Sequence, residues 1–236
     1  MSGLEYPKIQ TLFLRKPNGK VDITQLSKLE FGLIKEWQIT EKLNGRNIRV
    51  MLTSEGEVLF AGRKDEKHLS DQLHIKMIEY LKIKFIPDKM RKVFWRYVKG
   101  VYQKPEVCLY MEGLGSDMAA GSGVYCPGKE VSVRVIDCFM KPFWIERPLL
   151  EEFASKLGIK CVPVICTLKN ELPMSTSHIK YFIYKSIVAD EEACRNVMPE
   201  GVVARTQPLL FCRTKDEKRE VGDRLMWKLK FKDFEG

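Results

Sequence analysis

Residues 37–61 read WQITEKLNGRNIRVMLTSEGEVLFA, and this stretch alternates strand-like runs with turns. β-favouring residues from Trp37 to Ile48 surround a turn at Leu43-Asn44-Gly45. A strand over residues 49–53, a turn at 54–56 and a strand over 58–61 predict a hairpin. The stretch therefore predicts antiparallel β-structure.

Apolar residues recur at helical spacing in four further stretches. Ser70 is placed to cap a helix over residues 73–81, and Asp88 to cap one whose inward residues run from Met90 through Phe94 to 97 and 98. Pro148 at a first helical position and Gly158 as a stop bound the clearest helix, and a fourth is expected at 179–188. Further strands are expected at residues 107–112, 131–139, 161–166, 201–205 and 224–231.

This order of elements predicts an α+β fold with antiparallel sheets flanked by helices, because a doubly wound fold needs a regular β-α alternation. No internal repeat, linker or composition shift marks a domain boundary. A chain of 236 residues is long enough for one large domain or two small ones. We therefore expect a single domain over residues 1–236.

Composition excludes several classes of protein. The chain is 44% hydrophobic, which excludes a disordered chain, and no apolar run reaches the roughly 18 residues that a membrane span needs. The N-terminus lacks the apolar region of a secretory signal. Seven cysteines without a CxxC pair, and only three histidines, argue against a zinc site or a disulfide framework. We expect an intracellular, reducing location in the cytoplasm, with a phage or viral source as one option.

The charge balance suggests an anionic partner. Forty Lys and Arg against 31 Asp and Glu give a net charge of +9. Nucleic acid or nucleotide phosphates would suit such a chain, while a solvated basic surface is the alternative. The sequence contains no P-loop, no complete dinucleotide fingerprint, no GxSxG and no HExxH. If the protein is an enzyme, its nucleophile or base is therefore expected to be a lysine or a carboxylate.

Two lysine features could carry such chemistry. Lys42 stands at a strand end just before the glycine turn, where a lysine can project into a cleft, although most lysines of this kind lie on the surface. In residues 224–231, strict alternation places Trp227 and Leu229 on one face and Lys228 and Lys230 on the other, about 7 Å apart along the strand. Two ammonium groups this close favour an anion such as phosphate between them. The alternative is an exposed edge strand whose lysines discourage aggregation.

Two glutamates are the remaining candidates. Glu112 and Glu200 each precede a glycine, which would let a ligand come close. Each taken alone is also consistent with a solvated glutamate beside a turn.

Taken in order, these features resemble the covalent nucleotidyltransferases, the superfamily of ATP-dependent RNA ligases, DNA ligases and mRNA capping enzymes. The superfamily's motifs run KxxG, a strand ending in Glu-Gly, an aromatic-Asp strand, EGxV and KxK. The chain carries Lys42-Leu-Asn-Gly45, Leu109-Tyr-Met-Glu112-Gly113, Val133-Arg-Val-Ile136-Asp137, Glu200-Gly-Val-Val203 and Lys228-Leu-Lys230. The finer pattern is similar to the RNA-ligase branch, through Tyr6-Pro7-Lys8-Ile9, Asn47, Gly62-Arg63-Lys64-Asp65 and Asp233-Phe234.

The resemblance implies an ATP-grasp-like adenylation domain with the ATP site between sheets. Lys42 would be the nucleophile that attacks the α-phosphate of ATP to give lysyl-AMP and pyrophosphate, once it is a free amine. Lys228 and Lys230 would bind that phosphate and stabilise its transition state. Glu200 would be a metal-site carboxylate for Mg²⁺ or Mn²⁺.

The resemblance also implies a set of ATP-binding residues. Asn47 and Arg63 would order the phosphates and the incoming RNA 5′-phosphate, and Glu112 would accept a ribose hydroxyl. Val202 or Val203 would pack against the adenine, with Val202 preferred. Ile136 and Glu41 complete the expected ATP site.

Departures from the pattern matter. Ile136 stands where the family usually has a phenylalanine that stacks on adenine, and Thr40 stands where some RNA ligases have arginine. The sequence ends soon after the last motif, so we expect a stand-alone adenylation domain without a C-terminal OB-fold, which argues against a complete DNA ligase or capping enzyme.

The resulting hypothesis is an ATP-dependent RNA ligase. It would transfer AMP to an RNA 5′-phosphate and join that end to a 3′-hydroxyl, acting as a monomer without a membrane partner. The alternatives are a minimal DNA or polynucleotide ligase and a non-catalytic RNA-binding relic of the fold.

Overall fold

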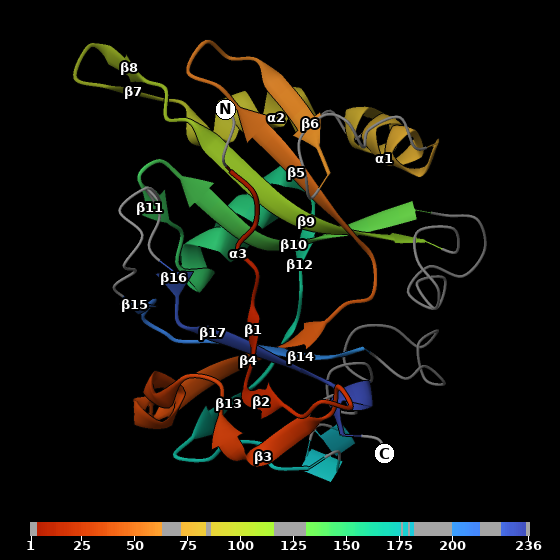
Figure 1. Ribbon diagram of the computed structural model, residues 1–236. Helices are drawn as coiled ribbons and strands as arrows, with labels where there is room; N and C mark the ends of the chain where they lie inside the picture. Colours follow the sequence, from red (N-terminus) through yellow and green to blue (C-terminus); the bar gives the residue numbers. More distant parts are fainter. Residues whose placement is uncertain are drawn as a thin grey trace. The chain divides into compact units, whose positions relative to one another are not determined.

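The computed structural model describes residues 4–62, 72–83, 86–115, 131–175, 177–178, 180–181, 200–212 and 223–234 (Figure 1). These residues form two compact units. The first, here called unit 1, contains the described residues within Met1–Tyr6 and Asn44–Cys161, and the second, unit 2, those within Pro7–Leu43 and Val162–Gly236.

Unit 1 is built on a six-stranded sheet. Its path runs β11-β10-β9-β5-β6, and β12 pairs in parallel with β10 off this path. The other pairings are antiparallel. The strands are β5 (Arg46–Leu52), β6 (Val58–Ala61), β9 (Val107–Gly115), β10 (Val131–Met140), β11 (Phe143–Trp144) and β12 (Lys160–Cys161). A separate hairpin joins β7 (Arg96–Val98) to β8 (Val101–Gln103).

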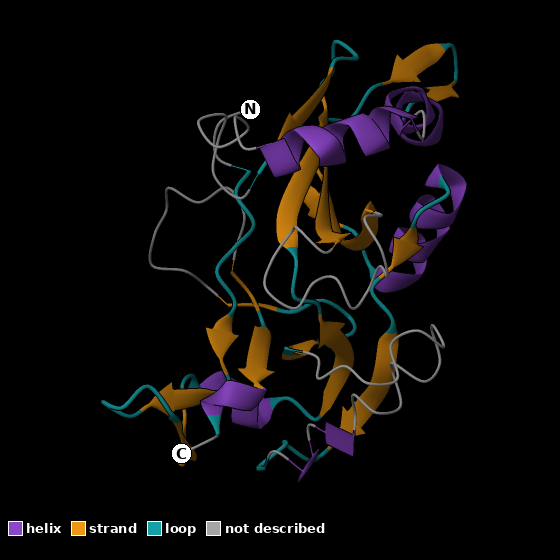
Figure 2. Cartoon of the chain, turned by 90° about the vertical axis from the view of Figure 1, so that its right-hand side faces the viewer, coloured by secondary structure: helices purple, strands orange, loops and turns teal. Residues whose placement is uncertain are grey.

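Three helices complete the described part of unit 1: α1 (Gln72–Ile83), α2 (Ile86–Phe94) and α3 (Arg147–Leu157). Figure 2 shows them alongside the sheet. Buried residues of the helices, such as Met77, Met90 and Phe153, share one hydrophobic core with strand residues such as Val50 and Leu109. Pro148 opens α3 and Gly158 ends it with φ of 74°, in the left-handed conformation that glycine adopts without strain.

Unit 2 is built on a five-stranded sheet in the order β1-β17-β14-β4-β13. β1 and β17 pair in parallel and the other neighbours are antiparallel. The strands are β1 (Gln10–Thr11), β4 (Glu36–Lys42), β13 (Val164–Lys169), β14 (Gly201–Arg205) and β17 (Met226–Lys230). One face of this sheet carries the second hydrophobic core. In it, the rings of Trp37 and Trp227 pack edge to face with their centroids 5.7 Å apart.

Smaller elements surround that sheet. The hairpin of β2 (Phe13–Arg15) and β3 (Val21–Leu26) follows β1, and the 3-10 helix η1 (Leu29–Leu33) precedes β4. β15 (Phe211–Cys212) pairs with β16 (Asp223–Arg224). The 3-10 helix η5 (Phe231–Asp233) follows β17 directly.

The predicted α+β class and antiparallel sheets are confirmed. The hairpin of β5 and β6, the helix α3 and the strand β14 lie where the sequence predicts them. The inward placement of Tyr97 and Val98 is wrong: both belong to β7, and their exposed fractions are 66% and 47%. The run 161–166 contains the end of β12 and the start of β13, so it is not one strand.

Two other predicted features lie largely outside the described residues. They are the cap at Ser70 and most of the helix expected at 179–188. None of the described helices is long and apolar enough to cross a membrane.

Candidate active site

Lys42, Glu200 and Lys230 converge at one end of the unit 2 sheet. Lys42 is the last residue of β4, Lys230 is the last residue of β17, and Glu200 immediately precedes the central strand β14. Gly201, the first residue of β14, pairs with Lys42 on one side and with Lys230 on the other. The sheet register therefore brings two lysines from opposite ends of the sequence to either side of one glutamate.

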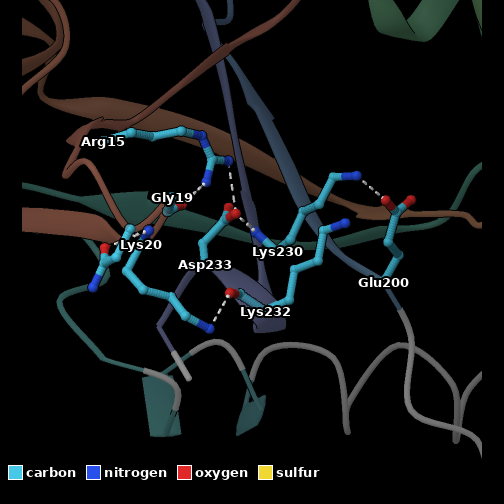
Figure 3. A network of polar contacts seen from close by, with 8 residues as sticks. Arg15, Gly19, Lys20, Glu200, Lys230, Lys232 and Asp233 are labelled. Atoms are coloured by element: carbon cyan, nitrogen blue, oxygen red, sulfur yellow. Dashed lines mark hydrogen bonds and ion pairs between the residues drawn. The ribbon is translucent and has the colours of Figure 1, made fainter. Parts of the chain in front are cut away.

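The carboxylate of Glu200 bridges the two lysines. Its Oε2 accepts a hydrogen bond from Lys42 Nζ. Its Oε1 forms an ion pair with Lys230 Nζ, which Figure 3 shows. The three side chains are about one-fifth exposed, at 23% for Lys42 and 20% for each of the others. The cluster is thus partly shielded from water yet open to a ligand.

Burial acts to raise the pKa of the Glu200 carboxyl, but hydrogen bonds and charge from Lys230 and Lys42 outweigh it. The net effect holds that pKa below its ordinary value. Glu200 therefore stays ionised at neutral pH, and the cluster carries two positive charges against one negative charge.

Gly201 is required by the sheet itself. A Cβ at this position would lie 2.0 Å from the carbonyl oxygen of Leu229 and 2.7 Å from the Cα of Lys230. Because these are backbone atoms, no side-chain rearrangement relieves the clash. The glycine after Glu200 thus serves the close approach of β14 to β17, whereas the sequence suggests the approach of a ligand.

The alternation of β17 is confirmed. Trp227 and Leu229 have no exposed surface and belong to the unit 2 core, while Lys228 and Lys230 are half-buried. Lys228 pairs with Val203 of β14 and with Thr11 of β1. The two lysines lie on the sheet face opposite the core, as the spacing predicts.

The same register places Val202 and Val203, the two residues expected near the adenine, on opposite faces of the sheet. Val202 is fully buried in the unit 2 core and pairs with Leu229, so its side chain lies on the core face. Val203 pairs with Lys228 and with Thr40, on the face that carries the lysines. This placement favours Val203, the alternative residue, over Val202.

Glu112 has a defined contact within unit 1. Its Oε1 accepts a hydrogen bond from the backbone N–H of Gly45 at 3.1 Å. The backbone is tightly packed here, since a Cβ on Gly45 would lie 2.2 Å from the carbonyl oxygen of Gly113. A Cβ on Gly113 would in turn meet Ile48 and Met77 at 2.7 and 2.9 Å. The glycines of the first and second motifs therefore hold one another in place.

Asn47 and Ile136 lie in the same sheet of unit 1. Asn47 pairs with Glu112, and its side-chain oxygen is buried without a hydrogen bond from any residue that the structure describes. The pairing of β10 with β9 shifts register between Val135 and Asp137, so Ile136 is the extra residue of a β-bulge and is half-buried. Bulges re-aim a side chain. A ligand that donates a hydrogen bond would satisfy the Asn47 oxygen.

Of the two remaining residues of the expected ATP site, the structure describes Glu41 but not Arg63. Glu41 is 5% exposed and pairs with Val202. Arg63 lies outside the described residues, so its expected role stays a prediction.

The donor set limits the kind of metal that could bind. In the described ranges, no three His, Cys, Asp or Glu side chains gather in one place. A single carboxylate does not suit an all-protein cage, but it fits Mg²⁺, which is usually held by one or two carboxylates together with phosphates and water. Both Glu200 oxygens contact lysines, so Glu200 would hold the ion only in exchange for one of them.

The structure also reveals a residue to which the sequence assigned no role. Asp233 has no exposed surface; its Oδ2 accepts the backbone N–H of Lys230 at 2.8 Å, and its Oδ1 lies 2.7 Å from Arg15 Nη2 (Figure 3). It forms the third residue of a capping box on η5. An aspartate three residues after the last lysine of the strand is the signal that could have identified it.

A second such contact lies in unit 1. The Tyr6 hydroxyl donates to Asp137 Oδ2 at 2.9 Å, and the Asp137 side chain is completely buried. Both residues belong to motifs of the sequence, but their contact was not predicted from it.

No protein-family model matches the sequence, and no curated protein sequence matches it. Among solved structures, a Naegleria gruberi RNA ligase mutant with ATP and Mn matches with a TM-score of 0.55 and 12% identity, over 87% of this chain and 53% of that one. A second mutant of that ligase, with AMP and Mn, matches with a TM-score of 0.54 and 15% identity, over 95% of this chain and 61% of that one. An archaeal ATP-dependent RNA ligase matches with a TM-score of 0.53 and 18% identity, over 85% of this chain and 44% of that one.

These likenesses establish the fold. The chain shares the α+β fold of these RNA ligases, which confirms the predicted resemblance at the level of the fold. It spans 53% and 61% of the Naegleria chains and 44% of the archaeal chain.

Proposed function

We propose that the protein is an ATP-dependent RNA ligase whose nucleophile is Lys42. The observation that carries the proposal is the convergence of Lys42, Glu200 and Lys230 at one end of a sheet, in a chain with an RNA-ligase fold. Two lysines that share one carboxylate leave a net positive charge, which suits the binding of phosphate.

In the first step, the Lys42 amine attacks the α-phosphorus of ATP. A nitrogen–phosphorus bond forms, the bond from that phosphorus to the bridging oxygen breaks, and pyrophosphate leaves with the electron pair. Lys42 must first lose its proton and leave Glu200, because an ammonium group has no lone pair to donate. Lys230 and Lys228 then stabilise the charge that develops on the phosphate oxygens.

Mg²⁺ or Mn²⁺, when bound at Glu200, would neutralise charge on the phosphate oxygens. Glu200 therefore has two tasks in the proposal. Without ATP, its carboxylate holds Lys42 and Lys230 together. When ATP binds, the carboxylate exchanges a lysine contact for the metal ion. In the later steps, the AMP passes from Lys42 to an RNA 5′-phosphate, and a 3′-hydroxyl displaces it to seal the strand.

Two other functions compete with this one. A minimal DNA or polynucleotide ligase would use the same first step, so only the strand that supplies the 3′-hydroxyl separates it from an RNA ligase. A non-catalytic relic would bind RNA without reacting with ATP. The intact set of Lys42, Glu200, Lys228 and Lys230 favours an active enzyme.

The deciding experiment incubates the protein with ATP labelled at the α-phosphate, in the presence of Mg²⁺ or Mn²⁺. We expect acid-stable label on the protein, pyrophosphate release, and a modified peptide that contains Lys42. Lys42→Ala should abolish the label, while Lys169→Ala, a change at a 68% exposed lysine of unit 2, should leave it unchanged.

Absence of label from the folded wild-type protein would reject the enzyme, and label on another lysine would reject Lys42. Nicked duplexes with ribose or deoxyribose at the 3′-hydroxyl side then separate RNA from DNA joining. Equal or faster joining at the deoxyribose end would reject the RNA assignment.

A further inference from the structure

A strongly basic pocket of about 690 Å³ lies within unit 2, beside the proposed site. Its walls come from β1, the β2–β3 hairpin, the end of β17 and η5. The charged residues that line it are Lys8, Arg15, Lys20, Lys228, Lys230, Lys232 and Asp233. Six cations therefore face one carboxylate among the described lining residues.

The single acid does not offset that charge at the surface of the pocket. The Asp233 side chain is fully buried, with Arg15 on one oxygen and the Lys230 backbone on the other. Arg15 is thus matched by Asp233, and Lys230 reaches out to Glu200 (Figure 3). Lys8, Lys20 and Lys232 have no ion pair with any residue that the structure describes, and Lys20 Nζ donates a hydrogen bond to the carbonyl oxygen of Lys232 at 3.2 Å.

Lysines gathered around one hollow repel each other unless anions lie among them. The hollow is larger than a single phosphate needs, and its cations are spread over the segment before β1, the β2–β3 hairpin, β17 and η5. Such an arrangement suits a chain of phosphates better than one isolated anion. The polar side chains of Asn18 and Ser27 in the same lining add hydrogen-bonding groups.

The position of the pocket decides which chain of phosphates it would receive. Lys228 and Lys230 belong both to the proposed adenylation site and to the lining of the pocket. A strand whose end is placed at those lysines can therefore continue directly past Lys8, Lys20 and Lys232.

We infer that this pocket binds the backbone phosphates of the RNA strand that receives AMP, through Lys8, Lys20 and Lys232. The inference rests on the proposed function, whose RNA substrate it provides with a path. Phosphate contacts of this kind fix the register of a strand without reading its sequence.

The test uses the full chain with Lys8→Ala, Lys20→Ala and Lys232→Ala combined, leaving Lys228 and Lys230 intact. The control combines Lys35→Ala, Lys169→Ala and Lys180→Ala, which removes the same charge from three exposed lysines of unit 2 outside the pocket. Binding of a fluorescent, 5′-phosphorylated single-stranded RNA is measured without ATP over a series of KCl concentrations. Melting temperatures confirm that both variants are folded.

The slope of log K against log salt is about 0.7 for each phosphate of a single strand that the protein neutralises. Three fewer neutralised phosphates should therefore reduce the magnitude of the wild-type slope by about 2 in the pocket variant, while the control keeps the full slope. Lysyl-AMP formation should be equal in all three proteins, while AMP transfer to the RNA should fall in the pocket variant alone.

An unchanged slope in the folded pocket variant would overturn the inference, and so would an equal reduction in the control. Loss of lysyl-AMP formation with an unchanged slope would assign the pocket to the triphosphate of ATP and overturn the inference as well. If the wild-type protein forms no lysyl-AMP but the slope falls as expected, the pocket is supported and the proposed enzyme fails. A combined Lys→Arg variant at the three positions should restore the slope, because arginine retains the charge.

Discussion

Lys42 and Glu200 are paired through their charged ends although 158 residues separate them in the chain. The pairing follows from the register of β4 and β14, in which Lys42 lies opposite Gly201. Lys230 reaches the same carboxylate from the other side of β14. Removal of Glu200 therefore leaves two neighbouring ammonium groups without their shared counter-charge.

Glu200→Gln is expected to destabilise unit 2 in a pH-dependent way. The folded protein holds the pKa of Glu200 below the ordinary glutamate value, so its ion pairs add stability above about pH 4.3, the value in an unfolded chain. That stability is lost as the pH falls through the lower folded value. Melting temperatures of the wild-type protein and the variant should differ at pH 7 and converge in acid.

Glu171→Gln serves as the matched control, because no ion pair of Glu171 is found in the part of the chain that the structure describes. A gap between the wild-type protein and Glu200→Gln that stays constant from neutral to acid pH would show that the carboxylate charge contributes nothing.

Gly45→Ala is expected to destabilise unit 1 by roughly 1–3 kcal/mol, the usual cost of overpacking. The new methyl group would lie 2.2 Å from the carbonyl oxygen of Gly113, a backbone atom that cannot rotate away. Relief of the clash would also stretch the hydrogen bond from Gly45 to Glu112. Urea unfolding measures the change. Gly32→Ala is the control, since its methyl group would meet only the flexible end of Leu26, at 3.1 Å. If Gly32→Ala destabilised the protein as much as Gly45→Ala, the packing argument would be refuted.

Substitutions at adjacent residues of β17 are expected to affect different properties, stability at Trp227 and adenylation at Lys228. Trp227→Ala should lower the free energy of unfolding by about 3–5 kcal/mol, because the ring is fully buried against Trp37. Lys228→Ala should leave stability near that of the wild-type protein but slow lysyl-AMP formation about a hundredfold or more, as for removal of an oxyanion donor. Melting temperature and adenylation rate are measured on the same preparations. Early unfolding of Lys228→Ala, with normal adenylation per folded molecule, would make this lysine structural.

The fold was predictable where local pattern decides the structure. The alternation in β17 assigned Trp227 and Leu229 to the core because strand side chains alternate between two faces. Pro148 and Gly158 marked the ends of α3 for equally local reasons. Proline has a fixed φ that suits the first turn of a helix, and glycine can adopt the left-handed φ that ends one.

What the sequence left open depends on pairing between distant strands. Which of Val202 and Val203 lies on the face that carries the lysines follows from the register of β14 with β17, which no local pattern contains. The stretch at Tyr97 continues the apolar spacing of α2, yet Lys99 and Gly100 turn the chain into a hairpin through positive φ values of 49° and 84°. The Asp233–Arg15 contact joins residues 218 apart, and only the folded sheet brings them together.

The buried carboxylate of Asp233 is expected to position Lys230. It binds the backbone N–H of Lys230 at 2.8 Å and the guanidinium of Arg15 at 2.7 Å, while Arg15 itself remains 41% exposed. Asp233→Ala should therefore cost roughly 1–3 kcal/mol for the donors left unpaired. It should also slow adenylation at temperatures where the variant is folded, because the end of β17 loses its anchor.

A double-mutant cycle separates the ion pair from the anchor. Arg15→Ala removes the ion pair and the hydrogen bond from Arg15 to the carbonyl oxygen of Gly19, but it leaves the Lys230 anchor in place. The double variant of Arg15 and Asp233 removes the anchor as well. Urea unfolding of the four proteins should give a coupling energy of about 0.5–3 kcal/mol, the range for residues that touch. Adenylation should fall with Asp233→Ala more than with Arg15→Ala, since only the former releases the Lys230 backbone. Additive stabilities, within about 0.5 kcal/mol, would show that the ion pair contributes nothing, and equal adenylation in the two single variants would refute the anchoring role of Asp233.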